Sequence, residues 1–289
     1  MARVTQRRRV RRLSAEGAVR DRADLLAGEE PLEVRVGGRS FSVTMRTPGD
    51  DFDLAVGFLH GEGVVASWDD VAQIDYRSGI GADGMRDYNI VDVQLAEGVA
   101  PPDPSLERHV YTSSSCGVCG TASIESVRRT SSYDLGADRV GLPLADLLAL
   151  PDRLRESQAV FDRTGGVHAA GLFVPSTAGP GLELVCLRED VGRHNAVDKV
   201  VGWALRERGM PLAGAVLQVS GRASFELVQK AALAGIPVLS AVSAPSSLAV
   251  ELAEEVGLTL IGFNRGRSLN VYTGGERVLA ADADEAAET

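Results

Sequence analysis

The sequence predicts an α/β fold class, with a mixed or mainly parallel sheet flanked by helices and a smaller N-terminal α+β part. Two observations lead to this prediction. After residue 215, apolar runs of strand length alternate with helical stripes at a regular spacing, as in βαβ units. Before residue 113, short alternating runs surround a single helical stretch.

The N-terminal part opens with a hairpin signal. Two runs that alternate apolar and polar residues, Leu32–Val36 and Phe41–Met45, are separated by Gly37 and Gly38. Paired glycines tolerate the backbone conformations of a tight turn, so these runs are expected to pair. Further strands are predicted at Val71–Tyr76, Tyr88–Leu95 and His109–Thr112.

A helix is predicted over Phe52–Leu59, directly after the first two strands. Thr47 is the expected cap, Pro48 suits the first helical position, and Asp50 completes a capping box. This is the single helix expected in the N-terminal part.

The second part combines long helices with buried strands. Helices are predicted at Thr121–Arg129, at Pro143–Phe161 with a break at Pro151, and at Val191–Arg206. Strands at His168–Val174 and Leu182–Leu187 are expected to form another hairpin. The regular alternation then runs through Ala215–Val219, Phe225–Ala234, Val238–Val242, Ser247–Val256 and Leu258–Phe263.

Charge divides the chain into four segments. Residues 1–28 are expected to be a basic, disordered arm, 29–112 an α+β subdomain, 113–275 the α/β core, and 276–289 an acidic tail. The net charge is −10, yet six arginines fall within the first twelve residues. An arm of this kind suits an acidic partner or nucleic acid, but a solvated terminus is the simpler expectation. We therefore expect no nucleic-acid partner.

The composition excludes two classes of protein. Three cysteines are too few and too uneven a set for a disulfide framework. No apolar run is long enough for a membrane span, and charges interrupt the stretch behind the first arginines, which argues against an export signal. The expectation is a cytoplasmic protein with no membrane partner.

The strongest local motif is a Cys-x-x-Cys pair in a loop rich in serine and glycine. Cys116 and Cys119 precede a predicted helix, whose N-terminus favours a thiolate. Three uses are open, besides a purely structural pair: dithiol redox chemistry, half of a zinc site, or a sulfur relay through a cysteine persulfide. Zinc would need two further ligands, and the chain offers only His60, His109, His168, His194 and Cys186. Cys186 itself lies in an apolar run and is expected to be buried.

A second polar cluster, Arg188–Lys199, follows a predicted strand. Asp190, His194 and Asp198 are four residues apart and are expected on one flank of a helix, whose first turn would present Arg193 and His194 to a ligand. An ordinary capped helix with a solvated face is an equally good interpretation.

Three further loops are suited to anions. Ser220–Ser224 and Ser243–Ser247 each lie between a strand and a helix, and Gly262–Tyr272 carries two arginines on a turn. None has the spacing of a P-loop or a dinucleotide fingerprint. Thr164–Gly171 is similar to one half of a zinc deaminase pattern, but Ala170 stands where the catalytic glutamate would be, which excludes that activity.

The order of these motifs is distinctive. The series comprises Thr47–Asp51, Ser115–Gly120, Thr164–His168, Arg188–Lys199, Ser220–Lys230, Ser243–Ser247 and Gly262–Tyr272. It resembles the formate dehydrogenase accessory sulfurtransferase family, FdhD, from about residue 30 to 273. The resemblance implies a core similar to the cytidine deaminase fold, and the arginine-rich arm is not part of the family pattern.

The resemblance also implies a function. Members of the family take sulfur from a cysteine desulfurase and pass it to the molybdenum cofactor, bis(molybdopterin guanine dinucleotide), of formate dehydrogenase. Cys116 would carry the persulfide with Cys119 assisting, no bound metal is implied, and a homodimer is expected. The cofactor would be bound by Phe263, Asn264, Arg265, Gly266, Arg267 and Ser268, together with Arg193, His194 and Arg222. A zinc-stabilised binding module and a non-catalytic cofactor chaperone are the alternatives.

Overall fold

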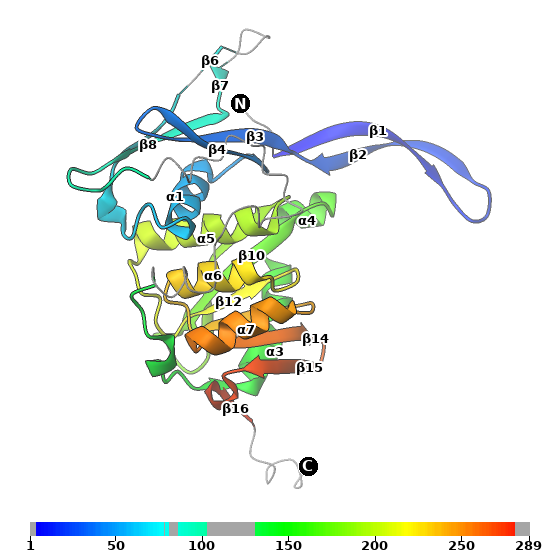
Figure 1. Ribbon diagram of the computed structural model, residues 1–289. Helices are drawn as coiled ribbons and strands as arrows, with labels where there is room; N and C mark the ends of the chain where they lie inside the picture. The colour runs from blue at the N-terminus through cyan, green and yellow to red at the C-terminus, as the bar shows by residue number, and fades with distance from the viewer. Residues whose placement is uncertain (1–3, 78, 81–85, 103–130, 281–289) are drawn as a thin grey trace.

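A six-stranded mixed sheet forms the centre of the molecule (Figure 1). The computed structural model describes residues 4–77, 79–80, 86–102 and 131–280. The strand order is β11-β10-β12-β13-β14-β15; β12 pairs parallel with β13 and β13 with β14, and the other neighbours are antiparallel. The strands are β10 (His168–Pro175), β11 (Leu182–Asp190), β12 (Val216–Val219), β13 (Val238–Ala241), β14 (Thr259–Arg265) and β15 (Ser268–Thr273). The predicted α/β fold class with a mixed sheet is confirmed.

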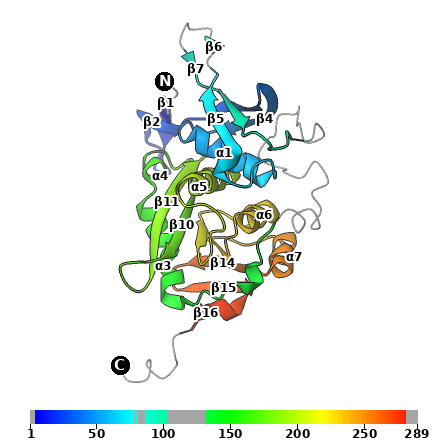
Figure 2. The ribbon, with the colours of Figure 1, turned by 90° about the vertical axis from the view of Figure 1, so that its left-hand side faces the viewer.

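Helices cover both faces of this sheet, as Figure 2 shows from the side. On one face lies α3 (Leu144–Glu156), and on the other lie α5 (Arg193–Glu207), α6 (Phe225–Leu233) and α7 (Ser247–Val256). The short helix α4 (Ala159–Thr164) follows α3. Alternate strand residues face the two sides, so the buried apolar residues form two clusters. The smaller cluster, under α3, contains Leu147, Leu150, Phe173, Val216, Val238 and Ile261 among others.

The N-terminal part forms a second sheet with the order β4-β3-β8-β5. Its strands are β3 (Glu30–Val36), β4 (Arg39–Arg46), β5 (Val71–Tyr76) and β8 (Ile90–Leu95), with the two-residue strands β6 (Gly79–Ile80) and β7 (Arg86–Asp87) nearby. Helix α1 (Asp51–Gly61) packs this layer onto α5. The two helix backbones touch: a Cβ at Gly57 would lie 1.9 Å from the carbonyl oxygen of Asp198, and one at Gly202 equally close to that of Asp53. Neither glycine was a sequence prediction.

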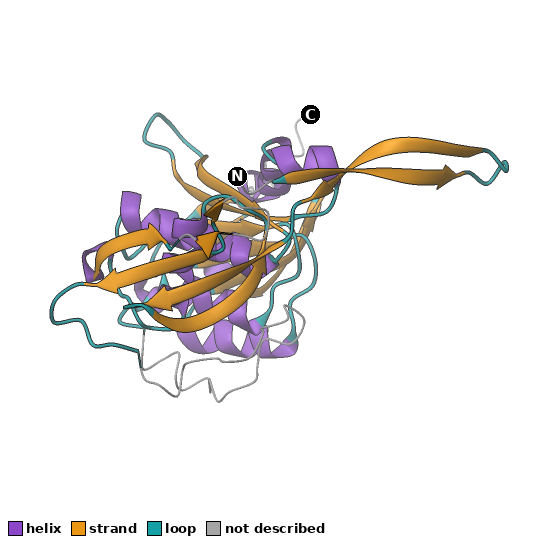
Figure 3. Ribbon diagram, turned by 90° about the horizontal axis from the view of Figure 1, so that it is seen from above, coloured by secondary structure: helices purple, strands orange, loops and turns teal. Residues whose placement is uncertain are grey.

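The expected disordered arm is wrong for residues 5–27, which form an antiparallel hairpin of β1 (Thr5–Leu13) and β2 (Val19–Ala27). Arg7 and Arg9 of β1 face Leu25 and Ala23 of β2, and Asp21 forms ion pairs with Arg9 and Arg11. These contacts give the segment a reason to pair that its overall charge does not reveal. Figure 3 shows the hairpin extending beyond the rest of the molecule.

Pro151 does not break its helix. It lies inside α3, and the break falls after Glu156, before α4. A proline lacks the N–H that would bond the carbonyl four residues earlier, here that of Leu147. The side-chain amide of Asn264 donates to that carbonyl oxygen at 2.7 Å, and so replaces the missing bond.

Two further boundaries differ from the prediction. The first helix begins at Asp51, with Asp50 in a left-handed conformation and without a side-chain cap bond; the Thr47 hydroxyl instead accepts from the Val191 N–H. Asp190 is the last residue of β11 rather than part of α5. The remaining elements are β9 (Leu142–Pro143), β16 (Val278–Leu279) and the 3-10 turns Trp68–Asp70, Leu135–Ala137 and Gly275–Arg277. No helix among the described residues has the length and apolarity to cross a membrane.

Candidate functional site

Several loops meet at the edge of the central sheet where the parallel strands β12, β13 and β14 end. In open α/β sheets, ligands bind outside these carboxyl ends. The loops after β12 and β13 are bridged at Ala223 and Pro245, and Ser243 joins its two neighbours: its N–H donates to the carbonyl of Gly221, and its carbonyl accepts from the N–H of Phe263. Two of the anion-suited loops and the start of the third therefore form one continuous rim.

The start of β10 and the start of α5 lie at the same rim because of the antiparallel pairing. The hydroxyl of Ser220 accepts from the N–H of Ala169, so His168 lies beside the end of β12. A Cβ at Gly221 would lie 3.5 Å from Nδ1 of His168 and 3.9 Å from Cδ of Arg193. The glycine thus leaves the backbone open between a histidine and an arginine.

His194 lies next to Arg193 on the first turn of α5 and is anchored to α6. Its Nε2 is 2.5 Å from a carboxylate oxygen of Glu226 and 3.3 Å from the hydroxyl of Ser224. This bonding from His194 lowers the pKa of the Glu226 carboxyl. We call His168, Arg193, His194, Arg222 and Glu226 the strand-end cluster.

Positive charge in the strand-end cluster exceeds what its carboxylate balances. Burial, followed by the nearby Arg222, lowers the pKa of the Arg193 guanidinium. Burial lowers the pKa of His168 as well, with Arg193 as the next cause. The Nε of Arg193 is buried and has no hydrogen-bond partner. Groups of one sign held close together in a half-buried site are suited to bind an anion.

The predicted segment Phe263–Ser268 divides into two parts. Phe263 has a φ of 50°, in the left-handed region that a bulky residue rarely adopts, and the guanidinium of Arg265 lies 5.5 Å from the centre of its ring. Arg265, Gly266, Arg267 and Ser268 are exposed. Strain of this kind often marks a functional segment.

Asn264 does not share the exposure of its neighbours. It is fully buried, and its side-chain amide donates to Leu147 and to the hydroxyl of Ser240 at 3.0 Å. Its contacts are those of a structural residue that completes α3, which differs from the cofactor-binding role implied for it by the resemblance.

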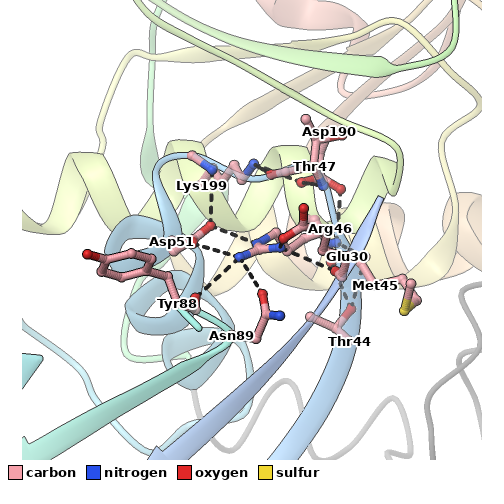
Figure 4. A network of polar contacts seen from close by, with 12 residues as sticks. Glu30, Thr44, Met45, Arg46, Thr47, Asp51, Tyr88, Asn89, Asp190 and Lys199 are labelled. Atoms are coloured by element: carbon pink, nitrogen blue, oxygen red, sulfur yellow. Dashed lines mark hydrogen bonds and ion pairs between the residues drawn. The ribbon is translucent and has the colours of Figure 1, made fainter. Parts of the chain in front are cut away.

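A buried polar network holds the N-terminal layer against the rim (Figure 4). Arg46 makes a bidentate pair with Asp51, both bonds at 3.0 Å, and Lys199 lies 2.8 Å from the carboxylate of Asp190. The other oxygen of Asp190 accepts from the N–H of Gly192, the residue directly before the charged first turn of α5. This network fixes the position of that turn.

Sequence comparison places the chain in a family. The profile of the FdhD/NarQ family matches residues 27–279. The chain belongs to this family. The FdhD/NarQ relatives include the sulfur carrier protein FdhD of Streptomyces coelicolor, 59% identical over 279 residues that cover 96% of this chain and 97% of the relative. The protein of the same name from Mycobacterium tuberculosis is 54% identical over 281 residues, covering 96% and 100%.

A solved structure shares the fold. The crystal structure of a protein from Desulfotalea psychrophila, named as a formate dehydrogenase accessory protein, has a TM-score of 0.71. It covers 96% of this chain and 100% of its own, at 24% sequence identity. The mixed α/β architecture of this FdhD/NarQ chain is therefore shared across a large sequence distance.

The predicted site residues have different outcomes in the structure. Cys116 and Cys119 lie outside the described residues. Arg193, His194 and Arg222 come together in the strand-end cluster, and the segment from Phe263 is joined to them through Ser243. Glu226 was missed; the available signal was an acidic residue in the first turn of a helix that follows an anion-suited loop.

Proposed function

We propose that this chain is a cytoplasmic sulfur carrier. It takes sulfane sulfur from a cysteine desulfurase as a persulfide and transfers it to the bis(molybdopterin guanine dinucleotide) molybdenum cofactor of formate dehydrogenase. Membership of the FdhD/NarQ family and the printed names of its relatives support the sulfur-carrier role. The residues proposed for each step are cysteines and cationic side chains of this chain.

The observation that carries the proposal is the state of the third cysteine. The chain has three cysteines, and Cys186 is only 5% exposed, within the larger apolar cluster. Burial raises the pKa of its thiol to about 12, so at neutral pH it is neither ionised nor accessible. Sulfur transfer needs an accessible thiolate, and this leaves Cys116 and Cys119 for the task.

Loading is a simple exchange between two sulfur atoms. The Cys116 thiolate attacks the outer sulfur of the donor's persulfide, the donor's sulfur–sulfur bond breaks, and the donor cysteine leaves as a thiolate. A new sulfur–sulfur bond forms at Cys116. The exchange balances without an external oxidant or reductant.

Release uses the second cysteine. Attack of the Cys119 thiolate on Sγ of Cys116 expels the outer sulfur as hydrosulfide, which keeps the persulfide proton and passes to the cofactor. A Cys116–Cys119 disulfide remains, and an external dithiol reductant returns it to two thiols. Each cysteine thus has a separate task.

The acceptor would be held by the rim of the central sheet. A guanine dinucleotide carries diphosphate groups, which arginines bind through paired hydrogen bonds. Arg193 and Arg222 supply positive charge beside Gly221, and Arg265 and Arg267 are exposed on the neighbouring turn. His168 adds an imidazole at the same edge.

Intact-mass measurement tests the loading step. The chain is incubated with a cysteine desulfurase and cysteine, and the mass gain of one sulfur atom is followed in the wild type and in Cys116→Ala, Cys119→Ala and Cys186→Ala. We expect the gain in all except Cys116→Ala, and expect Cys119→Ala to keep its sulfur when the cofactor is added. A gain that persists in Cys116→Ala, or that requires Cys186, would overturn the assignment.

A zinc-stabilised module is the competing function. It would need two histidines besides Cys116 and Cys119, and because His194 is paired with Glu226 these would come from His60, His109 and His168. Metal analysis separates the two functions: stoichiometric zinc that is lost on removing either cysteine would favour the module.

A further inference from the structure

Helices α5 and α6 are connected by two pairs of opposite charge that the sulfur chemistry does not use. His194 and Asp198 are four residues apart on α5, and Glu226 and Lys230 are four residues apart on α6, which packs beside it (Figure 1). Residues at this spacing lie on the same side of a helix, one turn apart. Both helices begin at the rim, so one pair lies at the rim and the other lies a turn deeper.

The deeper pair is buried and structural. Nζ of Lys230 lies 2.6 Å from Oδ1 of Asp198, whose side chain is 3% exposed. Helix α1 encloses the ammonium group from another side: a Cβ at Gly61 would lie 2.7 Å from the same Nζ, and the centre of the Phe58 ring lies 5.8 Å from it. A buried ion pair resists separation, because either charge alone would be left without a partner. This pair therefore fixes the position of α6 against α5.

The pair at the rim is more exposed, and α6 holds it at a single nitrogen. The side chains of His194 and Glu226 are 18% and 21% exposed, and Nε2 of His194 lies 2.5 Å from the carboxylate. Ser224 is the N-cap residue of α6, yet its hydroxyl makes no cap bond and lies 3.3 Å from the same Nε2. Two side chains at the start of α6 thus hold the imidazole from one side.

This bonding determines the tautomer of His194. The Glu226 carboxyl, whose pKa is lowered by its bond from His194, is ionised at neutral pH and can only accept. Nε2 must therefore donate. No residue in the described ranges bonds to the other ring nitrogen, Nδ1. His194 lies in the first turn of α5 beside Arg193, so Nδ1 is available to a ligand at the rim.

We propose that Glu226 is a positioning residue for the acceptor, and that it holds His194 so that Nδ1–H donates to a phosphate oxygen of the guanine dinucleotide. This role rests on the proposed function, because it adds one contact to the acceptor at the strand-end cluster. In the complex the imidazole donates from both nitrogens, to the phosphate and to Glu226. The buried pair of Asp198 and Lys230 keeps α6, and with it Glu226, in place.

A positioning role and a purely electrostatic role of Glu226 predict opposite results. If the carboxylate only adds negative charge to the cluster, its removal should strengthen the binding of an anion. If it positions His194, its removal should weaken that binding. Calorimetry with guanosine diphosphate decides between them. We expect Glu226→Ala to bind about tenfold more weakly, as for the loss of one hydrogen bond to a charged group. Glu226→Gln, whose amide oxygen can still accept from Nε2, should lose less.

A double-mutant cycle tests whether Glu226 acts through His194. His194→Ala should weaken binding to a similar extent, and Glu226→Ala in that background should weaken it no further. Nitrogen-15 NMR of the imidazoles, with the His194 signal assigned from His194→Ala, should show a proton on Nε2 in the wild type and a mixture of tautomers in Glu226→Ala. The matched control, Glu251→Ala, removes an exposed carboxylate from the neighbouring helix α7 and should leave affinity unchanged.

The outcomes separate this role from the proposed function. Circular dichroism checks that every variant is folded. Unchanged or tighter binding in Glu226→Ala, or an equal loss from this change when His194 is absent, would overturn the positioning role. A wild type that does not bind guanosine diphosphate would overturn it together with the acceptor site. Sulfur loading is measured separately, so a missing mass gain in the wild type would reject the sulfur carrier while the binding data still decide the role of Glu226.

Discussion

The buried network of Figure 4 and the strand-end cluster contain the same kinds of charged side chain, but these side chains have different roles in the two regions. In the network, Arg46 is paired with Asp51 and Lys199 with Asp190, and all four are at most 3% exposed. In the strand-end cluster, only three residues along the chain from Asp190, Arg193 lies near a second arginine and its Nε has no partner. Pairing distinguishes structural charge from charge kept for a ligand.

The comparison has a physical basis. A buried ion must be paired, because an unpaired one costs several kcal/mol. Charges of one sign at a half-buried rim repel one another, and an incoming anion relieves that repulsion. Removing a network residue should therefore lower stability, and removing a cluster cation should lower affinity. The four predictions below separate these effects.

The largest effect is expected in the network. Lys199→Met leaves the Asp190 carboxylate buried without its cation, and the free energy of unfolding should fall by about 3–5 kcal/mol. Urea denaturation measures it. Arg208→Met, which removes an exposed cation just after the same helix, should change stability by less than about 0.5 kcal/mol. Equal losses in the two variants would contradict the distinction.

The next effect belongs to the strand-end cluster. Arg193→Ala and Arg222→Ala should each weaken the binding of guanosine diphosphate by about tenfold or more, since a hydrogen bond to a charged group contributes about 1.5–3 kcal/mol. Calorimetry measures the affinity. The unfolding free energy should stay level or rise, because repulsion between the two guanidiniums is removed. Unchanged affinity in both variants would exclude this cluster as the anion site.

Asn264 lies in the predicted binding segment Phe263–Ser268 but has structural contacts, so a variant at this residue tests the distinction within one segment. Asn264→Ala leaves the Leu147 carbonyl without its donor, and stability should fall by about 1–3 kcal/mol, with diphosphate affinity unchanged. The matched variant is Asn270→Ala, on the exposed side of the adjacent strand, which should leave both quantities unchanged. Loss of affinity in Asn264→Ala without loss of stability would return this residue to the binding site.

The smallest effect is a pH dependence at His168, whose pKa is lowered by burial and then by Arg193. A bound anion favours the charged imidazole, so affinity for diphosphate should rise as pH falls below the ordinary histidine value of about 6.5. Stability of the unliganded chain should fall over the same range, because the unfolded chain binds this proton first. His168→Gln should remove the contribution of this histidine to the pH dependence of both affinity and stability. The pH dependence of affinity that comes from titration of the diphosphate itself should remain. Identical pH profiles in the variant and the wild type would contradict this role for His168.

Sequence patterns predicted individual helices and strands better than the contacts between them. The limits of α7 were predicted exactly, because a turn rich in serine precedes it and a glycine follows it. The role of Asn264 could not be predicted, since it depends on Pro151, more than a hundred residues earlier. The pairing of β1 with β2 was hidden by the run of arginines, whose partner Asp21 is visible only once the register is known.

The candidate site was predictable in part. The charged turn at Arg193 and the loop at Arg222 both follow strands, which pointed to the rim of the sheet. Which charges are structural was not predictable: Asp190 and Lys199 belong to the same polar run as Arg193, yet they are buried and paired. The packing of α1 onto α5 distinguishes the buried, paired charges from the charges that face the rim.

Sulfur delivery tests the central claim, that the thiols carry sulfur and the strand-end cluster holds its acceptor. Wild type and Arg193→Ala/Arg222→Ala are loaded with labelled sulfur by a cysteine desulfurase, freed of donor, and mixed with the molybdenum cofactor and formate dehydrogenase that lacks sulfurated cofactor. Both proteins should load to the same extent, and only the wild type should pass its label to the cofactor and activate the enzyme. Delivery by the double variant at the wild-type rate, or failure of that variant to load, would contradict the account.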